Sequence, residues 1–208
     1  MHDPKDHQAP HRFDDPRRSG ARQPERFDPH HADMLDDVSR FDYLPPEKIL
    51  QLLDPPSGGL IVDYGAGTGT YAIWLAHSRP DITVIALDEQ PEMLDRLRAK
   101  PEARDLPNLR PALPKEMKEF RGRADRVLTL NVLHELGDDA LEDLKSLFKD
   151  GGFVICIDWN AAVDRPVGPP KDHVYTPAEA ARRLGRFGFS VDTLDPFPYH
   201  YGLRARLR

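Results

Sequence analysis

Short apolar runs alternate along this chain with segments in which apolar residues recur at every third or fourth position. Such runs suit parallel strands that are buried on both faces, and the periodic segments suit helices that cover them. Strands are predicted at residues 60–62, 82–87, 126–130 and 153–157, with a fainter strand at 108–114 that contains two prolines. Because strand and helix signals alternate, the pattern predicts an α/β fold.

Proline and capping residues mark the limits of several helices. Pro45-Pro46 presets the first turn of a helix that Pro55-Pro56 ends. Thr176-Pro177-Ala178-Glu179 forms a capping box with proline at the first helical position. Another amphipathic helix is expected from Asp138 until just before Gly151, with an inner face made of Leu141, Leu144, Leu147 and Phe148.

Three glycines at alternate positions follow the first predicted strand, which ends in an acid. Glycine there permits unusual dihedrals and lets a ligand lie against the backbone. A dinucleotide loop, G-x-G-x-x-G, would place its third glycine where this chain has Thr70. We therefore expect a site for a different nucleoside cofactor, although a purely structural glycine turn is the alternative. The expected cofactor-binding residues are Asp63, Gly65, Ala66, Gly67, Thr68 and Gly69.

A second acid lies at the end of the second predicted strand. Asp88 follows Gly69 by 19 residues (88 minus 69) and precedes Glu89. An acid about 20 residues beyond a glycine loop is placed to bind ribose hydroxyls. The alternative is that Asp88 caps the helix that begins at Pro91. The two spacings together favour the ribose, with Glu89 as a further cofactor contact.

The D-x-G-x-G-x-G spacing resembles motif I of the class I S-adenosylmethionine-dependent methyltransferases. The resemblance widens to a family of small bacterial methyltransferases that are similar in fold to the ubiquinone and menaquinone biosynthesis methyltransferases. It extends from about residue 25 to the end of the chain. The segments that carry it are Arg26-Phe27-Asp28, Leu35-Asp36-Asp37, residues 45–50, the glycine motif, His134-Glu135-Leu136, Ile157-Asp158-Trp159 and residues 168–173.

The resemblance implies a Rossmann-like sheet of seven mostly parallel strands, in the order 3-2-1-4-5-7-6, with helices on both faces. Residues 199–207 would be its final, antiparallel strand, and S-adenosylmethionine its cofactor. The chain departs from the pattern in its faint third strand, which lacks the acid that usually binds the adenine amino group. A backbone carbonyl near Leu113 is an alternative adenine contact.

Catalytic candidates follow the fourth and fifth strands, because ligands bind beyond the carboxyl ends of parallel strands. Methyl transfer asks mainly for alignment and exclusion of water, and a base is needed only if the acceptor carries a proton. His134 is the first candidate for that base, since imidazole titrates near neutral pH. Asp158 and His173 are further candidates, and Asn131 is expected to contact the methionine part of the cofactor. Glu135 is expected to be structural.

Two aromatic residues precede the helix that begins near Pro46. Phe41 and Tyr43 are placed to form a lid over the substrate or cofactor, with packing as the alternative.

Composition divides the chain into a tail and one domain. Residues 1–33 are rich in proline and histidine, so they are expected to form a flexible tail that buries no core. Residues 34–208 are expected to form a single methyltransferase domain. No metal is expected, because the five tail histidines share no fixed ligand spacing on a regular element; they are His2, His7, His11, His30 and His31.

The charge and the single cysteine limit the classes of function that this chain can have. A net charge of -6 argues against general nucleic-acid binding. No leader follows Met1 and no apolar run is long enough for a bilayer, so a cytoplasmic protein without membrane attachment is expected. The lone Cys156 lies in a predicted strand and fits a core position.

Missing residues disfavour several methyl acceptors. Methylation of DNA exocyclic amines usually uses D/N-P-P-Y/F after the fourth strand, where this chain has Asn131-Val132-Leu133-His134. Methylation of pyrimidine C5 and of arsenite needs exposed thiols. A small-molecule acceptor remains as the expected partner. The alternatives are a non-catalytic protein that senses S-adenosylmethionine and, third, a nicotinamide oxidoreductase.

Overall fold

The computed structural model describes residues 27–208 and contains one sheet of seven strands. The strand order is β3-β2-β1-β4-β5-β7-β6, as predicted. Strands β1 to β5 are parallel to one another, while β7 runs antiparallel to both β5 and β6. The strands are β1 (Leu60–Tyr64), β2 (Thr83–Leu87), β3 (Leu109–Ala112), β4 (Ala124–Leu130), β5 (Phe148–Trp159), β6 (Phe189–Leu194) and β7 (His200–Leu207).

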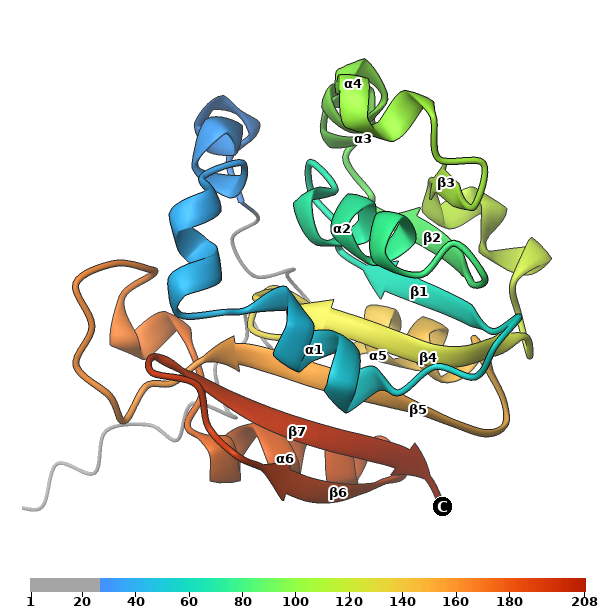
Figure 1. Cartoon of the computed structure of the whole chain (residues 1–208). Helices are drawn as coiled ribbons and strands as arrows, with labels where there is room; N and C mark the ends of the chain where they lie inside the picture. The colour runs from blue at the N-terminus through green and yellow to red at the C-terminus, as the bar shows by residue number, and fades with distance from the viewer. Residues whose placement is uncertain (1–26) are drawn as a thin grey trace, which may run out of the picture.

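Helices cover both faces of this sheet (Figure 1). Helices α1 and α2 lie on one face, and α5 and α6 lie on the other. The α-helices are α1 (Pro46–Leu53), α2 (Thr70–Ser78), α3 (Pro91–Ala99), α4 (Pro101–Arg104), α5 (Asp138–Lys145) and α6 (Pro177–Arg186). Shorter 3-10 helices are η2 (Pro29–Leu35), η3 (Val38–Asp42), η4 (Pro114–Glu119) and η5 (Lys171–His173).

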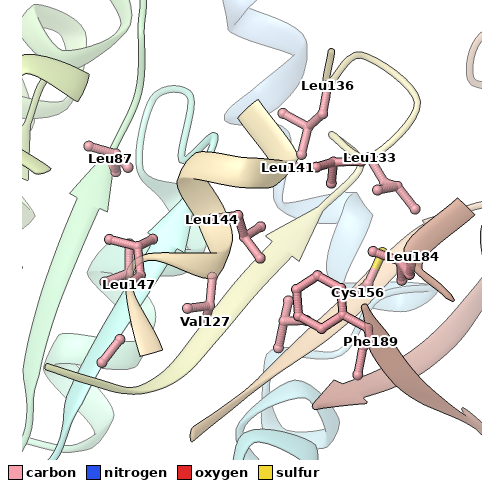
Figure 2. Close-up of a cluster of buried hydrophobic side chains, with 14 of the residues drawn as sticks. Leu87, Val127, Leu133, Leu136, Leu141, Leu144, Leu147, Cys156, Leu184 and Phe189 are labelled. Carbon is pink, nitrogen blue, oxygen red and sulfur yellow. The ribbon is translucent and has the colours of Figure 1, made fainter. Parts of the chain in front are cut away.

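Adjacent residues of the central strands pack into two separate hydrophobic cores, one on each face of the sheet. In β1, Ile61 packs with α1 and α2, while Val62 packs on the opposite face with α5 and α6. Strand residues alternate between faces, so a strand covered on both sides must be apolar throughout. This explains the continuous apolar runs in the sequence. Figure 2 shows the core beneath α5, where Leu144 lies above Val127 of β4.

Cys156 lies in this second core, as predicted, and is fully buried. Burial raises the pKa of its thiol well above the ordinary value. A thiolate is the reactive form of cysteine, so this position suits packing and not nucleophilic chemistry.

The helix predicted to end just before Gly151 is shorter than expected. Helix α5 ends at Lys145, and Phe148 already belongs to β5, where it pairs with Ala124 at the start of β4. The apolar spacing of the helix continues through Leu147 and Phe148, but pairing with β4 and packing of Phe148 against Phe189 favour the strand. The expected start of this strand at residue 153 was therefore too late.

The boundary predicted between tail and domain, at residue 33, falls inside η2. Ala32 of this helix is fully buried, and Asp28 caps the helix by accepting a hydrogen bond from the His30 N–H. Residues 27–33 thus pack on the domain, and the remainder of the predicted tail lies outside the described residues. No helix within residues 27–208 is both long and apolar enough to cross a membrane.

Candidate active site

A cavity of about 500 Å³ lies at the carboxyl ends of β1, β2, β4 and β5. Pockets for small ligands commonly have volumes of roughly 300–1,000 Å³. Its walls come from the loops that follow these strands, from residues 167–169, and from residues 27–43, which we call the N-terminal cover. In Figure 1, the blue N-terminal cover and the orange loop before α6 stand on the side to which β4 and β5 point.

The glycine loop after β1 forms one wall of the cavity. Gly65 and Ala66 donate backbone hydrogen bonds to the Leu87 carbonyl, at 2.8 and 3.0 Å, which ties the loop to β2. A side chain at Gly65 would overlap Val132, and one at Gly69 would overlap Leu97. Both glycines also have positive φ, so they allow close packing and strained turns. Gly65, Ala66, Gly67 and Thr68 line the cavity, whereas Gly69 lies behind it as the N-cap of α2.

Asp63 at the end of β1 has only 3% of its surface exposed and faces the cavity. Burial, together with repulsion from Asp88, raises the pKa of Asp63 to about 7. Arg40 of the N-terminal cover lines the same cavity and opposes this shift. Within residues 27–208, no hydrogen bond is donated to the Asp63 carboxylate. A carboxylate and a guanidinium in one cavity match the ammonium and carboxylate of a methionine group.

Asn131 follows β4 in a left-handed conformation, with φ of 59°. Asparagine tolerates this conformation better than most residues. Its side-chain oxygen is buried without a hydrogen-bond partner among the described residues, although Asn131 lines the cavity. A buried acceptor without a partner is costly, so a ligand N–H or O–H at this point would stabilise the site. The residues at the cavity therefore fit the methionine part of S-adenosylmethionine.

Asp88 links the second strand to the glycine loop. One carboxylate oxygen accepts a hydrogen bond from the Gly67 N–H at 2.8 Å, and the other accepts one from the Gln90 N–H at 2.9 Å. Asp88 does not cap α3 directly, because the N-cap residue is Gln90, but it supports the turn before that helix. A carboxylate has about four lone-pair sites, so ribose hydroxyls can still bind. The neighbouring Glu89 is exposed and is not among the lining residues.

His134 and Asp158 meet at the carboxyl ends of β4 and β5. The His134 Nδ1 lies 2.9 and 3.0 Å from the two Asp158 carboxylate oxygens, and the His134 backbone N–H donates to the same carboxylate. Asp158 is fully buried, whereas His134 lines the cavity. A carboxylate at Nδ1 favours the proton on that nitrogen and leaves Nε2 as the basic one. The pair can therefore accept a proton from a ligand.

Glu135, which the sequence suggested to be structural, also lines the cavity. One of its carboxylate oxygens accepts a hydrogen bond from the Phe27 N–H at 3.2 Å, and the other lies 3.6 Å from His134 Nε2. Burial raises the pKa of Glu135 to about 7, against the opposing effect of His134. Glu135 therefore lies between the N-terminal cover and the candidate base.

The two candidate lid residues have different positions. Phe41 packs edge-on against Tyr71, with ring centroids 5.4 Å apart, and is not among the cavity-lining residues. Tyr43 does line the cavity and stacks on the buried ring of His200 at 5.8 Å. His200 also packs against Trp159, with ring centroids 4.0 Å apart. Tyr43 and Trp159 therefore give the cavity an aromatic wall.

His173 lies in η5, outside the set of cavity-lining residues, although neighbouring residues of its loop reach the cavity. Val167, Gly168 and Pro169 line the cavity, and a side chain at Gly168 would lie only 3.0 Å from the Trp159 indole. Among the described residues, no group of three potential metal ligands comes together.

Polar contacts hold the N-terminal cover over the glycine loop. Asp36 accepts hydrogen bonds of 2.5 Å from both Lys100 and the Thr68 hydroxyl. Burial acts to raise the pKa of Asp36, but these hydrogen bonds lower it below its ordinary value. Gln90 also donates to the Phe27 carbonyl at 3.1 Å. Thr68, expected to bind cofactor, thus directs its hydroxyl at the cover.

Sequence reasoning missed three residues that shape the site. Arg40 reaches the cavity from a segment with no glycine or strand-end signal, and Gln90 reaches it from the turn after β2, two residues beyond Asp88. Arg183 of α6 is 3% exposed and donates to the Leu136 carbonyl at 2.5 Å and to the Tyr175 hydroxyl at 2.6 Å. It thereby holds the loop that carries His134. A charged residue on the inner face of an amphipathic helix was the available signal for Arg183.

Comparison with known proteins points to one class. Residues 61–152 match the family model described as a methyltransferase domain. A SAM-dependent methyltransferase from Aquifex aeolicus is 28% identical, with a TM-score of 0.79, over 86% of this chain and 98% of that chain. The structure of a DhpI–SAH complex is 22% identical, with a TM-score of 0.64, over 86% and 92%. A TehB-like SAM-dependent methyltransferase from Corynebacterium glutamicum is 17% identical, with a TM-score of 0.62, over 87% and 100%.

No curated protein matches the sequence at a significant level. The sheet order, the glycine loop and the cavity beyond it are nevertheless those of the class I S-adenosylmethionine-dependent methyltransferase fold. The chain resembles this class in fold and in its central segment, and it is an enzyme with S-adenosylmethionine as its cofactor. These findings favour methyl transfer over the non-catalytic and nicotinamide alternatives.

Proposed function

We propose that this enzyme methylates a small molecule and that His134 is its general base. The observation that carries the proposal is the hydrogen bond between His134 and the buried Asp158 at the edge of the cavity. A buried carboxylate that fixes one ring nitrogen prepares the other for proton transfer. A small acceptor is favoured because the N-terminal cover forms part of the cavity wall and is tied down at Asp36 and Phe27.

The cofactor residues follow from the contacts around the glycine loop. Asp63 and the Asn131 side-chain oxygen would receive the methionine ammonium, and Arg40 would bind the methionine carboxylate. Asp88 would bind the ribose while it holds Gly67 in place. When bound, S-adenosylmethionine supplies an electrophilic methyl group on a positively charged sulfur. The chain would align the acceptor with that group and keep water out, which are the main requirements of this reaction.

His134 would act on an acceptor that must lose a proton. Asp158 is a positioning residue, since it is fully buried and touches the imidazole and the backbone of His134 and Trp159. Its carboxylate keeps the proton on Nδ1, so that Nε2 takes the proton of the acceptor. The same carboxylate stabilises the imidazolium that results.

Parallel calorimetric titrations with S-adenosylmethionine, S-adenosylhomocysteine and NAD test the cofactor part of this proposal. We expect the first two to bind and NAD not to bind. Binding of NAD alone would contradict the cofactor assignment. Titration of the His134→Ala variant then separates catalysis from binding, because its affinity for S-adenosylmethionine should remain within about twofold of the unmodified protein.

A further inference from the structure

The part of the cavity beyond the expected cofactor residues has an acidic and aromatic lining. We call it the acceptor end and define it by Tyr43, His134, Glu135, Trp159 and residues 167–169. Tyr43 and Trp159 lie with ring centroids 6.2 Å apart and offer an apolar surface. The acceptor end therefore combines two aromatic rings with a carboxylate and a base.

The charges at the acceptor end favour a cation. Among the described lining residues, Arg40 is the only lysine or arginine, and it interacts with Asp63, Tyr71 and Tyr43. Arg165 is not a lining residue, but its guanidinium lies 5.4 Å from the centroid of the Trp159 ring. His134 has two carboxylates beside it, those of Asp158 and Glu135. An anionic acceptor placed between His134 and Glu135 would meet these carboxylates at close range, and like charges in a site of low dielectric repel strongly.

Resting on the proposed function, we propose that the methyl acceptor is an amine that binds as its ammonium ion, with Glu135 as the carboxylate that receives it. Tyr43 and Trp159 would pack against its organic group, and aromatic faces also attract cations. The Glu135 side chain keeps 19% of its surface exposed, while its neighbour Asp158 is fully enclosed. Glu135 is thus the carboxylate of this pair that a ligand can touch.

The surroundings of Glu135 support this role. Within residues 27–208, the Glu135 carboxylate accepts one hydrogen bond, from the Phe27 N–H, and lies 3.6 Å from Nε2 of His134. Burial without a permanent cation raises the pKa of Glu135 to about 7. An ammonium ion at this point would supply the missing charge and favour the ionised carboxylate. The contact with Phe27 would also place the N-terminal cover against the bound acceptor.

The base explains how such an acceptor becomes reactive, since an ammonium nitrogen has no lone pair to attack with. His134 Nε2 removes one proton from the ammonium and leaves a neutral amine. The nitrogen lone pair then forms the bond to the methyl carbon while the carbon–sulfur bond breaks, and the electron pair of that bond stays on sulfur. The products are a methylated ammonium ion, neutral S-adenosylhomocysteine and one proton, held first by His134.

Calorimetry on the full chain saturated with S-adenosylhomocysteine tests this inference. The probes are three molecules of similar size: 2-phenylethylamine, 4-ethylphenol and 3-phenylpropanoate. We expect the amine to bind at least tenfold more tightly than the phenol or the acid. The Glu135→Gln variant should lose at least tenfold in amine affinity, because the amide removes the charge but can still accept the Phe27 hydrogen bond.

The control variant is Glu142→Gln, which makes the same charge change at an exposed residue of α5 that pairs with Lys145. It should bind the amine normally. Amine affinity no better than that of the phenol or acid, or unchanged in Glu135→Gln, would overturn the inference. Before the amine is added, the protein is titrated with S-adenosylhomocysteine alone. This step distinguishes failure of the proposed function from failure of the amine proposal. Failure there would contradict the proposed function, whereas failure only with the amine would contradict the acceptor class.

Discussion

The carboxylate of Asp88 accepts a hydrogen bond from the Gly67 N–H at 2.8 Å, so the end of β2 holds the middle of the glycine loop. The other oxygen of the same carboxylate accepts from Gln90. One acid thus fixes two turns that border the cavity. Its loss should therefore affect both the shape of the loop and any direct contact with the cofactor.

We expect Asp88→Ala to weaken S-adenosylmethionine binding by about 1.5 to 3 kcal/mol, the usual scale for hydrogen bonds that involve a charged group. Asp88→Asn should have a smaller effect, because its amide oxygen still accepts one hydrogen bond. Calorimetric dissociation constants measure both. Glu89→Ala is the matched control, since Glu89 is exposed and does not line the cavity. An unchanged constant for Asp88→Ala would limit Asp88 to a structural role.

Substitution of Gly67 tests whether the glycine loop binds the cofactor. A Cβ at this position would lie 3.0 Å from the Leu35 side chain of the N-terminal cover, and its φ of 54° disfavours other residues. We expect Gly67→Ala to lower the free energy of unfolding by about 1–2 kcal/mol. It should also weaken cofactor binding by tenfold or more, because it pushes the loop and the cover apart.

Gly58→Ala is the control for backbone strain. Gly58 also has positive φ, at 72°, but a Cβ there would meet no atom within 4 Å. Urea denaturation should give a similar loss of stability for both variants, while calorimetry should show weaker cofactor binding for Gly67→Ala alone. Equal affinities in the two variants would show that the loop does not touch the cofactor.

Asp63 predicts a pH dependence of stability in the protein without ligand. Its pKa of about 7 in the folded state lies far above the value of about 3.9 for an unfolded chain. The folded state therefore holds the proton more tightly. The contribution of Asp63 to stability is fully present below about pH 4 and is lost as the pH rises through 7.

Asp63→Asn removes this titration. Relative to the unmodified protein, we expect the variant to gain stability between pH 4 and pH 8, on the order of a few kcal/mol. Urea denaturation at several pH values measures this difference. Glu135 has a raised pKa of the same kind and adds to the trend in both proteins. Parallel stability curves for the two proteins would contradict the assigned environment of Asp63.

The pairing of His134 with Asp158 predicts that substitutions at either residue lower turnover. His134→Ala should lower turnover by about 100-fold or more with an acceptor that must lose a proton. Asp158→Asn should also lower turnover, because its amide no longer fixes the proton on Nδ1. The pH profile distinguishes the roles. The rate should stop depending on imidazole ionisation in His134→Ala, whereas Asp158→Asn should keep that dependence with a shifted midpoint.

The fold was predictable because its signals are local. The apolar runs marked the central strands, and Thr176 with Glu179 marked the start of α6 by a capping box that the structure contains. Phe148 was misplaced because its position fits both the helical period and a strand, and only pairing with Ala124 decides between them. Composition likewise gave no sign that Ala32, inside the predicted tail, is buried, because its burial depends on tertiary contacts.

The site was less predictable than the fold. Asp63, Asp88 and His134 were found because each ends a strand or follows its end, where parallel sheets bind ligands. Arg40 was not predicted as a site residue, and Glu135 was predicted to have a structural role. Their place at the cavity depends on how residues 27–43 fold back over it. His173 was expected at the rim because its loop follows β5, but the loop turns on Gly168 and presents residues 167–169 instead.

The division of the cavity walls along the chain has an evolutionary consequence. The glycine loop, Asp88 and Asn131 all fall within residues 61–152, the part that matches the methyltransferase family model. Tyr43, Trp159 and residues 167–169 fall outside it. Substitutions at Tyr43, Trp159 and residues 167–169 would leave these donor-binding residues in place, whereas Arg40 of the N-terminal cover is itself a proposed contact of the methyl donor. A descendant of this enzyme could acquire a new acceptor by changes at the former positions while it keeps Arg40, and the same changes offer a route to redesign it.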